Sequence, residues 1–138
     1  MRRIMFLVSM FLVVGYTRAE ATLPETCQFR ESLKNATTPA QHQAGLKYIA
    51  GSMQMAILGN AMALRLVAMG NKQKVPLTDD ELRLCYREAN EILLGTPLEA
   101  PLKGIYTQWL KFRITPSERN LDAIQAAQLD MQASLDAM

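Results

Sequence analysis

Apolar residues recur every three or four positions through most of this chain, with polar residues between them, a pattern typical of amphipathic α-helices. No segment alternates apolar and polar residues with a period of two over more than a few positions, so we expect no β-strands. The pattern predicts an all-α fold, a compact bundle of about five helices with a long central one. The expected helices cover residues 24–34, 39–69, 79–94, 101–113 and 116–137.

Capping residues mark where these helices begin. The chain reads Thr-Pro-x-(Glu/Gln) at Thr38, Thr96 and Thr115, a capping box in which Thr is the N-cap, Pro takes the first helical position and Glu or Gln bonds back. A fourth start follows Thr78, where three successive acidic residues favour the helix dipole. Residues 97–100 belong either to the fourth helix or to a separate turn before it.

The helix expected at residues 39–69 differs from the others. Residues 48–64 contain no charge, and apolar side chains occur on every side. A helix that is apolar all round is usually buried all round, and small residues such as Ala56 and Gly59 would let neighbouring helices come close. We therefore expect this helix at the centre of the bundle. A transmembrane interpretation is weaker, because Lys47 and Arg65 flank the segment and two amide side chains lie within it.

Each of the last three predicted helices carries one apolar stripe, which we expect to face the core. The stripes are Leu82, Cys85, Ala89 and Ile92; Leu102, Ile105, Trp109 and Phe112; and Leu121, Ile124, Met131 and Leu135. Tyr106, Trp109, Phe112 and Arg113 are also of the residue types that anchor protein interfaces. The place of Trp109 in its stripe favours the core over an interface.

The N-terminus has the three parts of a secretory signal peptide. Two arginines precede an apolar run of 11 residues, 4–14, and a small-residue site follows at residues 19–21. Such a run is about half as long as a membrane-spanning helix, so we expect no stable membrane anchor. We expect residues 1–21 to be cleaved, which leaves a single helical domain, 22–138, in the periplasm.

Charge limits the partners of this mature domain. The whole chain has 15 basic and 13 acidic residues, and the signal segment contains three of the basic and one of the acidic ones. The mature domain is therefore formally neutral. A neutral domain is not expected to bind nucleic acid or anionic lipid, both of which require a basic surface.

Two cysteines, Cys27 and Cys85, remain after cleavage, and in an oxidising compartment we expect them to form a disulfide. They would close a loop of about 60 residues, for which the chain-entropy model gives roughly 4 kcal/mol. The alternative is a pair of buried free thiols.

The residues favour no catalytic chemistry. No serine lies in a G-x-S-x-G setting, and His42 is the single histidine, so no catalytic residues, metal ligands or cofactor are expected. Met53, Met55, Met62 and Met69 suggest a thioether copper set, but we expect Met53, Met55 and Met62 to point in different directions on a helix. Core packing is the interpretation we favour for them.

The connector at residues 72–77 is the first candidate for a partner-binding surface. It joins two well-capped helices and is longer than a tight turn requires. In the functional interpretation its lysines and stiff apolar tip enter a partner's cleft. In the structural one, Val75 and Leu77 fold back on the core. The candidate binding residues are Lys72, Lys74, Val75, Pro76 and Leu77.

The layout resembles a known family. An exported helical domain with Tyr48-Ile49-Ala50-Gly51 on its long helix and a Pro-containing connector is similar to the small periplasmic immunity proteins of type VI secretion amidase effectors. The chain departs from that family's pattern at Gln54, where the family has Asp, and at Lys47, where it has Gly. The resemblance implies a non-catalytic protein, often a homodimer, that binds and occludes a secreted hydrolase effector.

Two other functions remain open. A small helical periplasmic assembly or chaperone module would expose an apolar groove rather than a protruding loop. A carrier of a small apolar ligand would need an internal cavity beside the methionine-rich helix.

Overall fold

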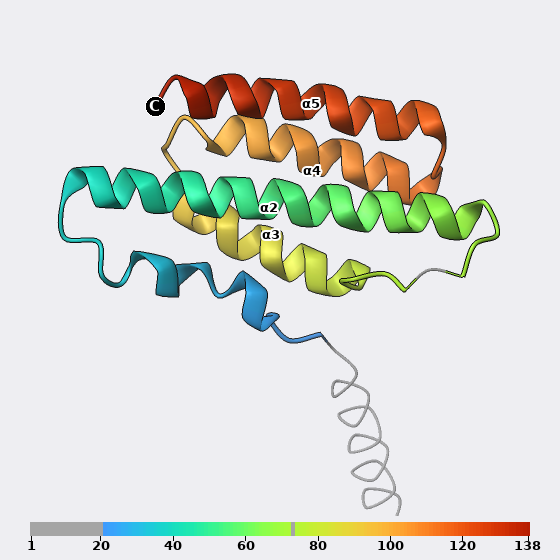
Figure 1. The fold of residues 1–138 in the computed structure, drawn as a ribbon, viewed down its shortest axis with the longest axis horizontal. Helices are drawn as coiled ribbons and strands as arrows, with labels where there is room; N and C mark the ends of the chain where they lie inside the picture. The colour runs from blue at the N-terminus through green and yellow to red at the C-terminus, as the bar shows by residue number, and fades with distance from the viewer. Residues whose placement is uncertain (1–20, 73) are drawn as a thin grey trace, which may run out of the picture.

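A computed structural model describes residues 21–72 and 74–138, so nearly all of the expected signal peptide, residues 1–21, lies outside the described residues. The described elements are all helical, as predicted (Figure 1). Four α-helices follow two short 3-10 helices, in the order η1 (Glu25–Cys27), η2 (Phe29–Leu33), α2 (Pro39–Ala68), α3 (Asp79–Leu93), α4 (Glu99–Ile114) and α5 (Glu118–Asp136). No helix in the described part of the chain is long and apolar enough to cross a membrane.

The expected first helix, residues 24–34, is wrong. Two 3-10 turns replace it, and the backbone at Gln28 breaks between them with a ψ of 66°. Cys27 and Phe29 explain the break, since both are buried although they are two residues apart. One α-helix would point two such side chains to opposite sides, because successive residues are separated by about 100°. The turn at Gln28 brings both of them to the core.

The predicted capping boxes at Thr38 and Thr78 are confirmed. The Thr38 hydroxyl accepts a hydrogen bond from the Gln41 backbone N–H at 3.1 Å, and the Gln41 side chain accepts one from the Thr38 N–H at 3.2 Å. Thr78 and Glu81 make the same pair of bonds, at 3.1 and 2.9 Å. Local sequence therefore fixes the starts of α2 and α3.

The other two Thr-Pro sequences do not cap the helices as predicted. The Thr96 hydroxyl bonds within a turn, to the Leu93 carbonyl at 2.7 Å, and α4 begins at Glu99. The sequence left two starts open, residue 97 and residue 101, and the observed start lies between them. The Glu99 carboxylate reaches back to the Gly95 N–H at 2.9 Å and ties the turn to the helix.

The last helix also begins later than its Thr-Pro sequence predicts. Ser117, rather than Thr115, is the N-cap, and its hydroxyl accepts from the Asn120 N–H at 3.1 Å. The Asn120 side chain donates to the Thr115 carbonyl at 2.8 Å, which holds residues 115–117 as a turn ahead of the helix. Thr115 and Ser117 are both possible N-caps here, and Ser117 is the one that caps α5.

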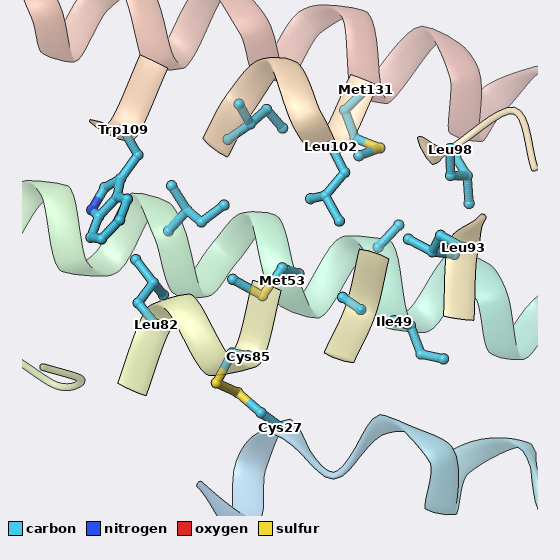
Figure 2. Close-up of a cluster of buried hydrophobic side chains, with 14 of the residues drawn as sticks. Cys27, Ile49, Met53, Leu82, Cys85, Leu93, Leu98, Leu102, Trp109 and Met131 are labelled. Atoms are coloured by element: carbon cyan, nitrogen blue, oxygen red, sulfur yellow. A yellow bond between two sulfur atoms is a disulfide. The ribbon is translucent and has the colours of Figure 1, made fainter. Parts of the chain in front are cut away.

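The core lies where α2 packs against α3, α4 and α5. The predicted stripes of the last three helices face it, and Figure 2 shows Met53 of α2 among side chains from the other helices. Trp109 and Phe112 are fully buried, which confirms their expected place in the core. The largest fully buried side chains are Trp109, Phe112, Ile49, Met53, Ile57, Leu82, Leu93, Leu98, Leu102, Ile105, Ile124 and Met131.

Asn60 is a buried polar residue inside this apolar core, with 1% of its surface exposed. Its side-chain carbonyl accepts from the Trp109 indole N–H at 2.7 Å, and its amide donates to the Leu77 carbonyl at 2.8 Å. Both ends of the amide are therefore bonded, which removes most of the cost of burying it. Asn60 thereby joins α2 to α4 and to the end of the connector.

A disulfide joins Cys27 to Cys85 and confirms the predicted pairing (Figure 2). It fastens the N-terminal 3-10 segment to α3. Arg30 strengthens the same junction through ion pairs with Glu88 and Glu91, at 3.2 and 2.9 Å. A disulfide of this kind indicates an oxidising, secreted environment.

Candidate protein-binding surfaces

One face of α2 is open, which contradicts the expectation of a helix buried on every side. Tyr48 is 63% exposed, Met55 62%, Met62 49% and Met69 60%, and Leu66 is exposed as well. α2 contacts η2, α3, α4 and α5, and these neighbours cover only part of its circumference. The helix is therefore apolar on two sides. The rest of the chain covers one of them and leaves the other exposed.

The exposed face has a regular register. Its residues follow one another at alternating separations of four and three positions, which places them on one side of the helix at the 3.5-residue period of coiled coils. We call this set the α2 stripe. It consists of Tyr48, Ser52, Met55, Gly59, Met62, Leu66 and Met69.

Two glycines of this helix, Gly51 and Gly59, are not required by packing inside the molecule. A Cβ atom added at Gly51 or Gly59 would meet nothing within 4 Å, and Gly59 is exposed. The expectation that small residues here admit neighbouring helices of the same chain is therefore wrong for these two positions. Because Gly59 has no side chain, it instead leaves a depression in the middle of the α2 stripe.

The methionines divide between the two faces. Met53 is fully buried, as expected, whereas Met55, Met62 and Met69 are exposed on the α2 stripe, so the core-packing interpretation is wrong for these three. Flexible, polarisable methionine side chains are common on surfaces that bind other proteins. Within residues 21–72 and 74–138, no group of three or more His, Cys, Asp or Glu residues is placed to hold a metal ion.

The connector candidates are only partly exposed. Lys72, Lys74 and Pro76 are exposed, whereas Val75 and Leu77 are half-buried and Leu77 packs against the core. This placement agrees with the structural interpretation for Val75 and Leu77. The expected apolar tip is reduced to Pro76, and the two lysines are the remaining groups that a partner would meet.

The second candidate region contains an aromatic stack that the sequence did not reveal. Tyr86 of α3 and Tyr106 of α4 stack with ring centres 3.8 Å apart and planes 3° apart. Tyr106 in turn lies 5.5 Å from Trp109, and the Arg113 guanidinium lies 5.4 Å from the Trp109 ring centre. Arg113 also pairs with Asp79 at 2.6 Å. The side chains here contact one another, so the region connects α3 to α4.

Burial acts on both tyrosines of this stack. It is the main cause that raises the pKa of the Tyr86 hydroxyl above its usual value of 10, and the neighbouring Tyr106 adds to the effect. Burial also raises the pKa of Tyr106, although nearby arginines, led by Arg83, oppose the shift. Desolvation disfavours the phenolate in both cases.

Two open hollows lie away from the α2 stripe. One is lined by Ala21, Asp80, Arg83, Leu84 and Arg87. The other is lined by Arg30, Leu33, Lys34, His42, Glu91 and Ile92. Each lining includes three charged side chains, and neither includes a methionine of α2. These two hollows do not supply the apolar cavity that a small-ligand carrier would need.

Comparisons with protein-family models, with curated proteins and with solved structures found no significant match. Functional argument therefore rests on the surfaces described above.

Proposed function

We propose that the mature domain, residues 22–138, is a periplasmic immunity or inhibitor protein. It would bind and occlude a cell-wall-degrading effector enzyme and catalyse no reaction itself. The signal-peptide pattern at the N-terminus and the disulfide both support export to an oxidising compartment. The resemblance to immunity proteins supports the type of partner.

The observation that carries the proposal is the anchored connector. The Leu77 carbonyl is bonded to buried Asn60, and the Thr78 capping box begins immediately afterwards. The C-terminal end of the connector is thus fixed, while Lys72, Lys74 and Pro76 expose their side chains. A surface held in place before binding loses little conformational entropy when a partner docks.

Charge supports the same site. Residues 32–78 contain no Asp or Glu, and of the acidic residues that follow directly, Asp79 pairs with Arg113 and Glu81 caps α3. Exposed lysines complement an acidic cleft rim or, in a glycoside hydrolase, the catalytic carboxylates. The charges are expected to speed association more than they strengthen the final complex.

Growth protection tests this function directly. The exported hydrolases encoded beside this gene in the source genome are directed to the periplasm of a test bacterium, with and without the full-length chain. We expect the chain to restore growth and to bind one of these enzymes with one-to-one stoichiometry in calorimetry. If none of the enzymes binds and growth is never restored, the proposal is wrong.

Charge reversal locates the site. The double variant Lys72→Glu/Lys74→Glu should reduce the association rate at low salt and lose much of this deficit at moderate salt, because added ions screen exposed charges. The matched control is Lys103→Glu/Lys111→Glu, which makes the same change of charge at two exposed positions of α4. Equal effects of the two variants would move the interface away from the connector.

A second function, a helical assembly or chaperone module, is favoured by one observation, the exposed α2 stripe. A chaperone of this kind would keep an unfolded exported polypeptide from aggregating, whereas an inhibitor would leave aggregation unchanged and stop a folded enzyme. Light scattering of a reduced, unfolding test protein, with and without the purified chain, distinguishes the two.

A further inference from the structure

We infer that the α2 stripe is the interface of a homodimer in which two copies of α2 pack antiparallel to each other. The inference does not depend on the inhibitory function, because it concerns a different surface from the connector. It commits to a second copy of this chain as the occupant of the stripe. Register, shape, area and charge support it independently.

The register of the stripe is nearly symmetric about Gly59. Met55 and Met62 lie four positions before and three after it, and Ser52 and Leu66 each lie seven positions away. Tyr48 and Met69 lie eleven before and ten after. If a second copy of α2 packs antiparallel to the first, with the two-fold axis near Gly59, stripe residues therefore meet stripe residues over the whole length of the stripe. A symmetric dimer requires this self-complementarity.

Side-chain sizes fit the same arrangement. Near the two-fold axis each residue meets its own copy, and Gly59, with open space above it, allows the two helices to approach closely. On either side, Met55 of one copy lies level with Met62 of the other. Small Ser52 lies level with the larger Leu66 in the same way, and alternation of large and small residues is how facing layers interdigitate.

The exposed area is sufficient for a dimer. The exposed apolar side chains of α2 are Tyr48, Met55, Met62, Leu66, Val67 and Met69. With ordinary side-chain areas their exposed fractions amount to roughly 600 Å² on each copy, or about 1,200 Å² in a pair, which reaches the range of specific interfaces. Exposed apolar area of this size is at the upper end of what monomeric proteins show and often marks a binding site.

Charges do not oppose the contact. Residues 48–64 contain no ionised side chain, so like charges do not meet in the central part of the pair. Lys47 and Arg65, the nearest cations, are bonded to the two ends of α5. The Lys47 ammonium donates to the Met138 carbonyl at 3.4 Å, and Arg65 donates to the Pro116 carbonyl at 3.2 Å. The pair therefore avoids the repulsion that a self-contact between charged helix faces would create.

The antiparallel arrangement has a consequence for the connector. Each connector follows the C-terminal end of its own α2, and these ends point in opposite directions in the dimer. Ala68, the last residue of α2, lies nine positions past Gly59 and thus about 14 Å from the two-fold axis, so the two helix ends would lie roughly 27 Å apart along the pair. Residues 39–47 of each α2 would extend past the end of the other copy's α2 and run alongside the start of its connector.

Molecular mass in solution tests the dimer. The full chain is expressed with export, and the mature protein is purified from the periplasm with its disulfide intact. Sedimentation equilibrium should give the mass of two chains at micromolar concentration. Met55→Glu/Met62→Glu should give the mass of one chain with an unchanged circular dichroism spectrum, since both residues are exposed. The control Leu94→Glu/Leu129→Glu changes two exposed apolar residues outside α2 and should remain dimeric.

Cross-linking tests the antiparallel register and does not depend on how the glutamate variant folds. Both native cysteines are paired, so an introduced cysteine is the reactive thiol. Gly59→Cys should form a covalent dimer on mild oxidation, whereas Tyr48→Cys should do so only when mixed with Met69→Cys. A monomeric wild type, a dimer that survives Met55→Glu/Met62→Glu in folded form, or self-linking of Tyr48→Cys would each overturn the inference.

Discussion

Replacing Asn60 with Ala should destabilise the protein more than almost any other polar substitution in the chain. The change leaves the Trp109 indole N–H buried without an acceptor, and an unsatisfied buried donor costs about 1–3 kcal/mol. It also removes the bond to the Leu77 carbonyl, worth about 1 kcal/mol net, because that half-buried carbonyl then bonds to water. Ala gains roughly 0.5 kcal/mol in helix propensity. We expect a net loss of about 2–3 kcal/mol in the free energy of unfolding.

Urea denaturation followed by tryptophan fluorescence measures this loss. Trp109 is the single tryptophan of the chain and the direct partner of Asn60, so its emission reports on the site that is changed. The control is Asn90→Ala on α3, since Asn90 makes only a long bond of 3.5 Å to the Tyr86 hydroxyl. That variant should stay within about 0.5 kcal/mol of wild type.

The same substitution should loosen the connector. With the Leu77 carbonyl released, trypsin should cut after Lys72 and Lys74 faster than in wild type at a urea concentration where both proteins remain folded. A loss of stability below about 0.5 kcal/mol, together with unchanged proteolysis, would refute the reasoning that Asn60 holds α2, α4 and the connector together.

Three further results are expected. Thiol titration of the denatured, oxidised protein should find no free thiol, and Cys27→Ser/Cys85→Ser should lower stability by about 2–4 kcal/mol in urea titrations. Gly59→Ala in the monomeric Met55→Glu/Met62→Glu background should raise stability by about 0.5–1 kcal/mol, because the added methyl group meets open space; a large loss would show that the position is packed within the monomer. Tyr86 and Tyr106 should ionise above pH 10 in a spectrophotometric titration. Both pKa values are raised in the folded state, so the contribution of the two tyrosines to the free energy of unfolding is complete below pH 10. The free energy of unfolding should then fall as pH rises through the pKa values of the folded state.

Local signals predicted the helices well. The capping boxes at Thr38 and Thr78, the three apolar stripes and the disulfide are all present in the structure. The caps and stripes depend on residues that are close in sequence, and the disulfide depends on the chain having just two cysteines. The predictions failed where two short-range signals compete, as at Thr115 and Ser117, or where a distant contact decides, as at Gln28 between two buried neighbours.

The candidate surfaces were predicted less well, for a physical reason. Apolar composition shows that a side chain tends to be covered, but it does not show whether the same chain or another one covers it. Residues on all sides of α2 look alike in sequence, although Met53 is buried by the bundle and Met55 is not. The partners of Asn60 lie 17 and 49 positions away, so no sequence pattern could place them.

The open stripe also bears on solubility. Residues 22–138 have no net charge, so repulsion between molecules of this domain is weak and exposed apolar surface promotes association. Random association through the stripe would lead to aggregates, whereas a two-fold contact uses up the same surface on both copies and closes. Met55→Glu/Met62→Glu removes apolar area and adds two negative charges, so the resulting monomer should stay in solution. Replacing Gly59 with Leu should block the close approach of two helices yet leave the methionines exposed, and that variant should aggregate during concentration while Met55→Glu/Met62→Glu does not.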